Sequence, residues 1–128
     1  MMQLTKAEEQ VMQILWDLDK GTVQEVREKF ENPRPARTTV ATVLTILENK
    51  GFATHITNGR ANTYFPTVAK ETYSKTQLFG IMKNYFNDSF ASMASFFVKE
   101  NNLSIEELDE LIESTKEELR KEQENNRK

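Results

Sequence analysis

The sequence contains no cysteine, which excludes disulfide bonds, thiolate metal sites and cysteine nucleophiles. Its single histidine, His55, has no carboxylate at ligand spacing, so we interpret it as a strand surface residue and not as a metal ligand. The motifs of zinc proteases, serine hydrolases, P-loop NTPases and dinucleotide-binding enzymes are all missing. We therefore expect neither an enzyme, nor a metal site, nor a cofactor.

Long apolar runs are missing as well. No stretch is long enough to span a membrane, and the N-terminus lacks the apolar core of a signal peptide. Hydrophobic residues make up 38% of the chain and charged residues 29%, which is typical of a soluble helical protein. We expect a cytoplasmic protein without direct membrane insertion.

The chain has no excess of positive charge, since its formal net charge is −3, but its charges are unevenly distributed. Residues 1–66 carry eight basic and eight acidic side chains, whereas residues 67–128 carry nine basic and twelve acidic ones. Between residues 27 and 66, six basic residues stand against three acidic residues. This segment is therefore the expected binding region for an anionic partner.

Two periodicities follow each other in the segment Arg37–Tyr64. Its first part has apolar residues at helical spacing, namely Val40, Val43, Leu44 and Leu47. Gly51 is expected to end this helix in a left-handed conformation. Two extended segments then flank Asn58-Gly59, a strong signal for a two-residue type I′ hairpin turn. A helix that leads directly into a hairpin predicts a winged helix-turn-helix.

The preceding residues complete this motif. A first helix is expected over Thr5–Leu18 and a short second helix after Thr22, because each begins with a capping box. A proline-rich turn at residues 32–35 separates the second helix from the third. Met12 and Trp16 lie off the apolar stripe of the first helix and indicate a second contact surface, with the C-terminal half as the expected partner.

The face of the third helix opposite its apolar stripe carries small side chains. Its members are Thr38, Ala41, Thr42 and Thr45. Threonine is a mediocre helix former, but in a major groove it can contact base edges or a thymine methyl group. Arg34, Arg37 and Arg60 lie at the helix entrance and the hairpin tip, where we expect them to meet phosphates. The alternative is a solvated threonine-rich face with ordinary surface arginines.

The second half of the chain is expected to form helices interrupted at residues 87–89 and 101–102, with a capping box at Ser104. The apolar residues predicted for dimerisation are Leu78, Met82, Tyr85, Phe86, Phe90, Met93, Phe97, Leu108, Leu111 and Ile112. About sixty residues with this many aromatics are too few for a self-sufficient monomeric core, so we expect burial against a second copy. A ligand pocket lined by the aromatics is the alternative.

Several short motifs occur in an order that resembles the penicillinase repressor family (BlaI/MecI/CopY-type transcriptional regulators). They are Leu4-Thr5-Lys6-Ala7-Glu8, Ile14-Leu15-Trp16, Thr38-Thr39-Val40, Thr42-Val43-Leu44, Lys50-Gly51, and Gly59-Arg60 with Tyr64 and Pro66. The similarity covers nearly the whole chain. It implies a cytoplasmic repressor that binds double-stranded operator DNA as a homodimer. It also implies β-lactamase or related antibiotic-resistance genes as targets, and a membrane sensor protease as a partner.

The resemblance further implies how repression is relieved. Members linked to β-lactam resistance are cut in the dimerisation domain between an asparagine and a phenylalanine. The corresponding bond here joins Phe96 to Phe97, so that phenylalanine replaces the asparagine. The alternative is that both residues belong only to a core. The copper-responsive branch of the family uses cysteines near the C-terminus, and their absence argues against metal sensing.

We therefore predict a mainly α-helical protein with a small β-hairpin wing. A winged helix-turn-helix DNA-binding domain is expected over residues 1–67, with a complete core of its own, and a helical dimerisation domain over residues 68–128. The expected function is repression from a pseudo-palindromic operator. The alternative is a winged-helix protein–protein adaptor, which would lack strong salt dependence on random DNA.

Overall fold

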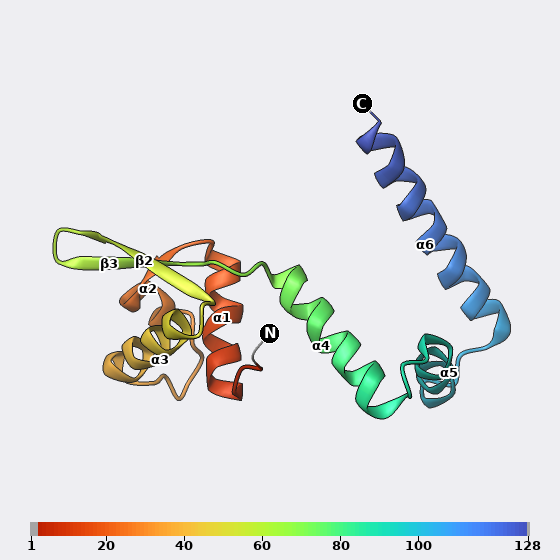
Figure 1. Ribbon diagram of the computed structural model, residues 1–128, viewed down its shortest axis with the longest axis horizontal. Coiled ribbons are helices and arrows are strands. Elements are labelled where there is room, and N and C mark those ends of the chain that lie inside the picture. Colours follow the sequence, from red (N-terminus) through yellow and green to blue (C-terminus); the bar gives the residue numbers. More distant parts are fainter. Residues whose placement is uncertain (1–2, 128) are drawn as a thin grey trace. The chain divides into compact units, whose positions relative to one another are not determined.

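A computed structural model of the chain describes residues 3–127 (Figure 1). Its elements are α1 (Lys6–Leu18), β1 (Gly21–Thr22), α2 (Val23–Glu28), α3 (Arg37–Asn49), β2 (Ala53–Asn58), β3 (Ala61–Pro66), α4 (Lys70–Tyr85), α5 (Phe90–Glu100) and α6 (Ile105–Asn126). The chain forms two compact units, one ending at Leu78 and the other beginning at Phe79, so the division falls within α4. The predicted fold class, mainly helical with a hairpin wing, is confirmed.

Both predicted capping boxes of the helix-turn-helix are formed. The backbone N–H of Thr5 donates to the Glu8 carboxylate at 2.9 Å, and the Glu8 N–H donates to the Thr5 hydroxyl at 3.3 Å. The corresponding distances for Thr22 and Glu25 are 2.9 and 3.2 Å. Since each box satisfies two backbone groups that the first turn leaves free, it determines where the helix begins.

The wing is formed by β2 and β3, but its turn lies one residue later than predicted. Asn58 pairs with Ala61, which leaves Gly59 and Arg60 as the two turn residues. Gly59 has a φ of +62°, and Arg60 is not among the described residues with positive φ. This is the pattern of a type II′ turn, which requires glycine only at its first central position. The predicted type I′ turn at Asn58-Gly59 is therefore wrong, and Arg60 itself forms the hairpin tip.

The sheet has a third strand that the sequence did not indicate. β1 pairs antiparallel with β3, with Gly21 opposite Tyr64 and Thr22 opposite Thr63, giving the order β1–β3–β2. A strand of two residues is too short to show an alternating pattern. Gly21 is buried, and a Cβ at this position would lie 3.2 Å from the Leu18 Cδ1 atom.

The core of the first unit lies among α1, α2, α3 and the sheet, and includes one residue of α4. Its buried members are Leu4, Val11, Met12, Leu15, Val26, Val40, Leu44, Leu47, Phe52, Ala53, Tyr64 and Tyr73. The Trp16 indole N–H donates to the Val68 carbonyl at 2.8 Å, and the Trp16 ring lies 5.8 Å from that of Tyr73. This confirms the predicted contact of Trp16 with the second half of the chain. Because Tyr73 is 3% exposed, the core extends beyond residue 67, where it was expected to be complete.

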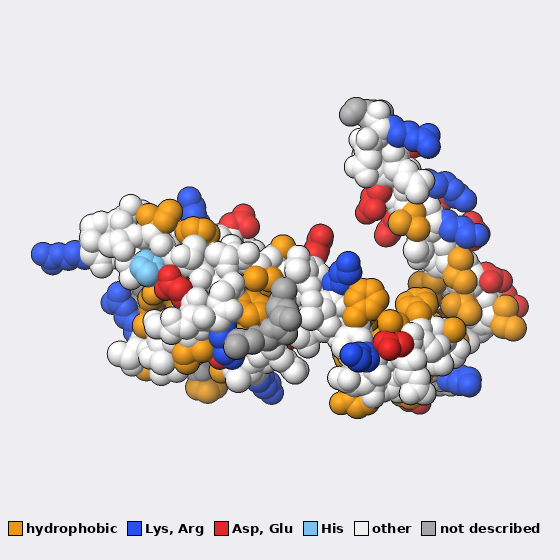
Figure 2. All heavy atoms as spheres, viewed as in Figure 1, with side chains coloured by type: hydrophobic (Ala, Val, Ile, Leu, Met, Phe, Trp, Pro, Cys, Tyr) orange, Lys and Arg blue, Asp and Glu red, His pale blue; other side chains and the backbone are white. Residues whose placement is uncertain are grey.

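The second unit consists of the rest of α4, with α5 and α6. The predicted interruptions are confirmed by positive φ angles at Asn87, Asp88 and Asn102, and the capping box at Ser104 is formed. Neither α5 nor α6 contains a buried residue. Large exposed apolar side chains of this part of the chain include Phe79, Ile81, Tyr85, Phe90, Phe96, Phe97, Ile105, Leu111, Ile112 and Leu119. Figure 2 shows hydrophobic side chains on the surface of this unit.

An ion pair joins the first turn of α1 to the end of α3. The Lys50 ammonium lies 2.6 Å from the Glu8 Oε1 atom, and Glu8 is only 5% exposed. Lys50 is the C-cap residue of α3, and Gly51 follows with the predicted left-handed φ, +84°. The Lys50 ammonium, together with the Thr5 backbone N–H, holds the pKa of the Glu8 carboxyl below its ordinary value of 4.5.

We expect the Glu8–Lys50 pair to make the stability of the first unit depend on pH. Because the pKa of Glu8 is lowered by folding, its contribution is complete above pH 4.5 and is lost as the pH falls through the lowered pKa. Glu8→Gln should lower the free energy of unfolding by about 1–3 kcal/mol at pH 7. It should also flatten the loss of stability in acid.

Chemical denaturation at a series of pH values measures both effects. Glu9→Gln is the matched control, because Glu9 lies in the same helical turn but has no ion pair or side-chain hydrogen bond among the described residues. An acid dependence identical in the wild type and Glu8→Gln would show that the pair does not contribute.

Candidate nucleic-acid interface

The orientation of α3 is fixed by its apolar face and by its entrance. Val40, Leu44 and Leu47 are at most 1% exposed. Ahead of the helix, the Arg27 Nε–H donates to the Pro35 carbonyl at 2.9 Å and so attaches α2 to the turn that leads into α3. The predicted turn at residues 32–35 thus has a side-chain anchor, which the sequence analysis missed.

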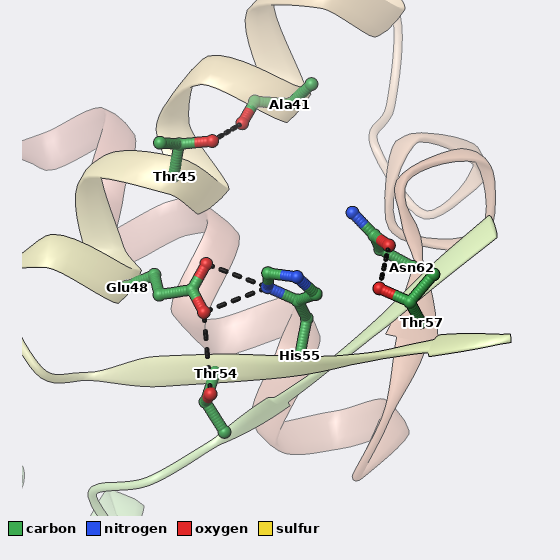
Figure 3. Close-up of polar contacts among 7 residues, drawn as sticks. All are labelled: Ala41, Thr45, Glu48, Thr54, His55, Thr57 and Asn62. Carbon is green, nitrogen blue, oxygen red and sulfur yellow. Dashed lines mark hydrogen bonds and ion pairs between the residues drawn. The ribbon is translucent and has the colours of Figure 1, made fainter. Parts of the chain in front are cut away.

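The opposite face of α3 carries the four predicted base-reading residues. Thr38, Thr42 and Thr45 are exposed and Ala41 is half-buried. The Thr42 hydroxyl donates to the Thr38 carbonyl at 2.9 Å. The Thr45 hydroxyl donates to the Ala41 carbonyl at 3.0 Å, as drawn in Figure 3. These bonds use the hydroxyl protons, so each oxygen offers acceptor lone pairs and each side chain a methyl group. Such groups suit the amino groups of adenine and cytosine and the methyl group of thymine in a major groove.

The three predicted phosphate-binding arginines have different surroundings. Arg34 donates from Nε to the Phe30 carbonyl and from an Nη atom to the Glu28 carbonyl, both at 3.3 Å, and thereby closes the end of α2. Arg37, the first residue of α3, and Arg60, at the wing tip, are exposed, and their side chains have no hydrogen bond or ion pair to other residues within residues 3–127. In Figure 2, one basic side chain projects where Figure 1 draws the tip of the hairpin.

A polar cluster that sequence reasoning missed joins α3 to the wing. The His55 Nδ1 atom lies 2.9 Å from both carboxylate oxygens of Glu48, and the Thr54 hydroxyl donates to Glu48 at 3.4 Å (Figure 3). The His55 ring lies 5.1 Å from that of Tyr64. Because an ionised carboxylate only accepts hydrogen bonds, Nδ1 carries a proton in this arrangement. His55 was expected to be an ordinary strand surface residue, but its side chain is only 31% exposed and has a defined partner.

Other kinds of site are weakly supported. Within residues 3–127, no three histidine or acidic side chains are grouped so that they could hold a metal ion. No helix in that range is long and apolar enough to cross a membrane. A groove of about 840 Å³ lies between α1, residues 30–35 and α3. Its rim mixes Lys29 and Arg34 with Glu31, so its charges select no single class of ligand.

The chain is similar in sequence to known repressors. The chain is 28% identical over 112 residues to the penicillinase repressor of Bacillus licheniformis. The aligned region covers 87% of this chain and 88% of that protein. The DNA-binding domain of the repressor BlaI, solved in solution, is 28% identical, with 56% of this chain and 88% of that chain covered and a TM-score of 0.49. The CopR repressor structure is 26% identical, with 52% and 99% covered and a TM-score of 0.45.

The sequence model of one family, described as penicillinase repressor, matches residues 4–117. This range includes the whole winged helix-turn-helix and most of the C-terminal helices. The protein therefore belongs to the penicillinase repressor family, a family of DNA-binding transcriptional repressors and not of enzymes.

Proposed function

We propose that the protein binds a pseudo-palindromic operator as a homodimer and represses transcription by blocking the promoter. The observation that carries this proposal is the exposed face of α3, where three threonines stand opposite the buried stripe and beside a wing with Arg60 at its tip. Two such helices related by a twofold axis would occupy successive major grooves.

In this proposal, Thr38, Ala41, Thr42 and Thr45 read bases, and Arg37 and Arg60 bind phosphates. Arg34 can add a phosphate contact through the guanidinium donors that the Phe30 and Glu28 carbonyls leave unused. The alternative, a winged-helix adaptor that binds another protein through this face, has no observation of its own in its favour. A repressor and an adaptor differ in how their affinity for random DNA depends on salt. Phosphate contacts produce a strong salt dependence, and an adaptor would make none.

Dimerisation is assigned to the helices of residues 68–128. The support is the exposure of their apolar side chains. Of the residues predicted for this role, Leu78, Tyr85, Phe90, Phe97, Leu111 and Ile112 are exposed, and Met82, Phe86, Met93 and Leu108 are half-buried. This amount of exposed apolar surface in about sixty residues favours association with a second copy.

We further propose that the regulated genes encode β-lactamase or a related resistance function, that a membrane sensor protease is the partner that relieves repression, and that the repressor works in the cytoplasm. These proposals rest on membership of the family and on the similarity to a repressor of penicillinase. A footprint on the DNA that flanks the gene for this chain would identify the operator.

The first test concerns Thr42, which lies at the centre of the exposed face. Thr42→Ala is expected to weaken binding to the footprinted operator by about 1–3 kcal/mol and to leave binding to random DNA almost unchanged. Thr115→Ala is the matched control, because the Thr115 hydroxyl makes the same helical bond, to the Leu111 carbonyl, in the second unit. Equal losses on both DNAs would contradict base reading by Thr42.

The second test concerns the dimer. A fragment ending at Leu78 is expected to fold and to sediment as a monomer, since it retains Tyr73 and its contacts with Trp16 and Phe52. A fragment ending at Thr67 should be less stable by about 3 kcal/mol, because it lacks that buried ring. Sedimentation of the Leu78 fragment as a stable dimer would place the interface in the first unit instead.

The third test concerns relief of repression by cleavage between Phe96 and Phe97. Both residues lie in α5, where they are 54% and 59% exposed, and the Phe96 ring lies 5.5 Å from that of Phe86. A cut there would separate the two reading heads, which together gain about 10²- to 10⁴-fold from effective concentration. Mass spectrometry of the chain from β-lactam-treated cells should show this cut, after local opening of the helix. An intact chain under full induction would exclude it and leave release by a ligand as the explanation.

A further inference from the structure

Glu48 is an acidic residue where an anionic ligand is expected. It is the only acid in α3, and it lies toward the helix end on the same flank as Ala41 and Thr45 (Figure 3). A carboxylate beside DNA phosphates is unfavourable by simple charge repulsion. Both of its oxygens, however, are engaged by His55 and Thr54 of β2, so the group acts within the protein.

The cluster is the outermost polar attachment of the wing to α3. The base of the hairpin is held by the buried residues Phe52, Ala53 and Tyr64. Beyond His55, residues 56–61 are all exposed, and Ile56 is 57% exposed. Within residues 3–127, no hydrogen bond or ion pair joins α3 to that outer part. The bond from the Thr57 hydroxyl to the Asn62 amide oxygen, 2.8 Å, connects only the two strands to each other.

Any rotation of the outer hairpin about His55 therefore produces its largest displacement at the tip, where Arg60 lies. β2 runs three residue steps beyond His55 to its last paired residue, Asn58, and the turn adds about one more, which at about 3.3 Å per residue is a reach of about 13 Å. A rotation of about 10° at His55 would displace the tip by about 2 Å over that reach. Such a displacement is enough to break a hydrogen bond between a guanidinium and a phosphate.

We propose that Glu48 and His55 are positioning residues that set the angle between the reading helix and the wing. The pair holds the hairpin so that Arg60 reaches a phosphate while the threonine face of α3 lies in the major groove. This inference rests on the proposed function, because it assigns a role within DNA binding. Neither residue needs to contact DNA itself.

The experiment measures whether the contribution of Arg60 depends on Glu48. The full-length protein is titrated with a random-sequence duplex of about three helical turns at several salt concentrations, since phosphate contacts do not require the operator. Arg60→Ala is made in the wild type, in Glu48→Ala and in Glu31→Ala. Glu31 is an exposed acid near the entrance of α3, so its removal changes the charge without touching the wing.

In the wild type and in Glu31→Ala, loss of Arg60 should reduce the slope of log affinity against log salt by about one. In the Glu48→Ala background, Arg60→Ala should reduce the salt slope by less than about half of the wild-type reduction, because the hairpin tip is no longer held at the phosphate. A full reduction in the Glu48→Ala background overturns the inference while leaving DNA binding intact. Absence of any salt-dependent binding by the wild type refutes the proposed function itself.

Two substitutions of His55 separate positioning from direct contact. In His55→Asn, the amide nitrogen occupies the position of the histidine Nδ1 atom and can still donate to Glu48. In His55→Gln, the amide nitrogen occupies the position of the Nε2 atom, and the bond to Glu48 is lost. His55→Asn should therefore retain the wild-type effect of Arg60→Ala, and His55→Gln should behave as Glu48→Ala does. The reverse result would show that His55 contacts DNA through Nε2 and would overturn the positioning role. Thermal unfolding of each variant checks that the first unit remains folded.

Discussion

The constraint on which the interface depends is the burial of one face of α3. Val40, Leu44 and Leu47 pack into the core of the first unit. Because helical residues are spaced by 100°, the threonines of α3 then lie on its solvent-exposed face. The two ends of the helix are fixed separately. At its entrance Arg27 is bound to the Pro35 carbonyl, and at its end Lys50 is paired with Glu8 of α1. The exposed face is thus presented by a helix that can neither rotate nor slide without breaking a buried contact.

Two acidic residues of the first unit are engaged by other side chains of the protein. Glu8 neutralises Lys50, while Glu48 accepts hydrogen bonds from His55 and Thr54. Arg37 and Arg60 have no such partners within residues 3–127. A chain with a net charge of −3 can in this way present a basic surface, because binding to phosphates depends on which charges face the ligand and not on their total.

The two units differ in what their side chains bury. Among the described residues, the first unit has a dozen buried apolar side chains, whereas α5 and α6 have none. Phe90, Phe97 and Leu111 are exposed, and this exposed apolar surface is the physical reason for our proposal that this part of the chain mediates association. In a repressor, the same arrangement would couple the state of the dimer to occupancy of the operator.

The sequence alone determined the features that depend on residues close together in the chain. The capping boxes at Thr5, Thr22 and Ser104, the apolar stripe of α3 and the left-handed Gly51 were all predictable, because each is decided within one or two helical turns. The four small residues on one face of α3 follow from the same periodicity.

Only the tertiary structure decided the features that join distant parts of the chain. Pairing of Gly21 with Tyr64 forms β1, and Tyr73 enters the core from α4, yet neither has a local pattern. The register of the hairpin, which moved Arg60 into the turn, was set by strand pairing and not by the Asn58-Gly59 dipeptide. The link between Glu48 and His55 crosses the boundary between a helix and a strand, where no single periodicity applies. Many residues have the same local propensity to form such contacts, and tertiary packing decides which of them do. The local sequence pattern therefore does not identify these contacts.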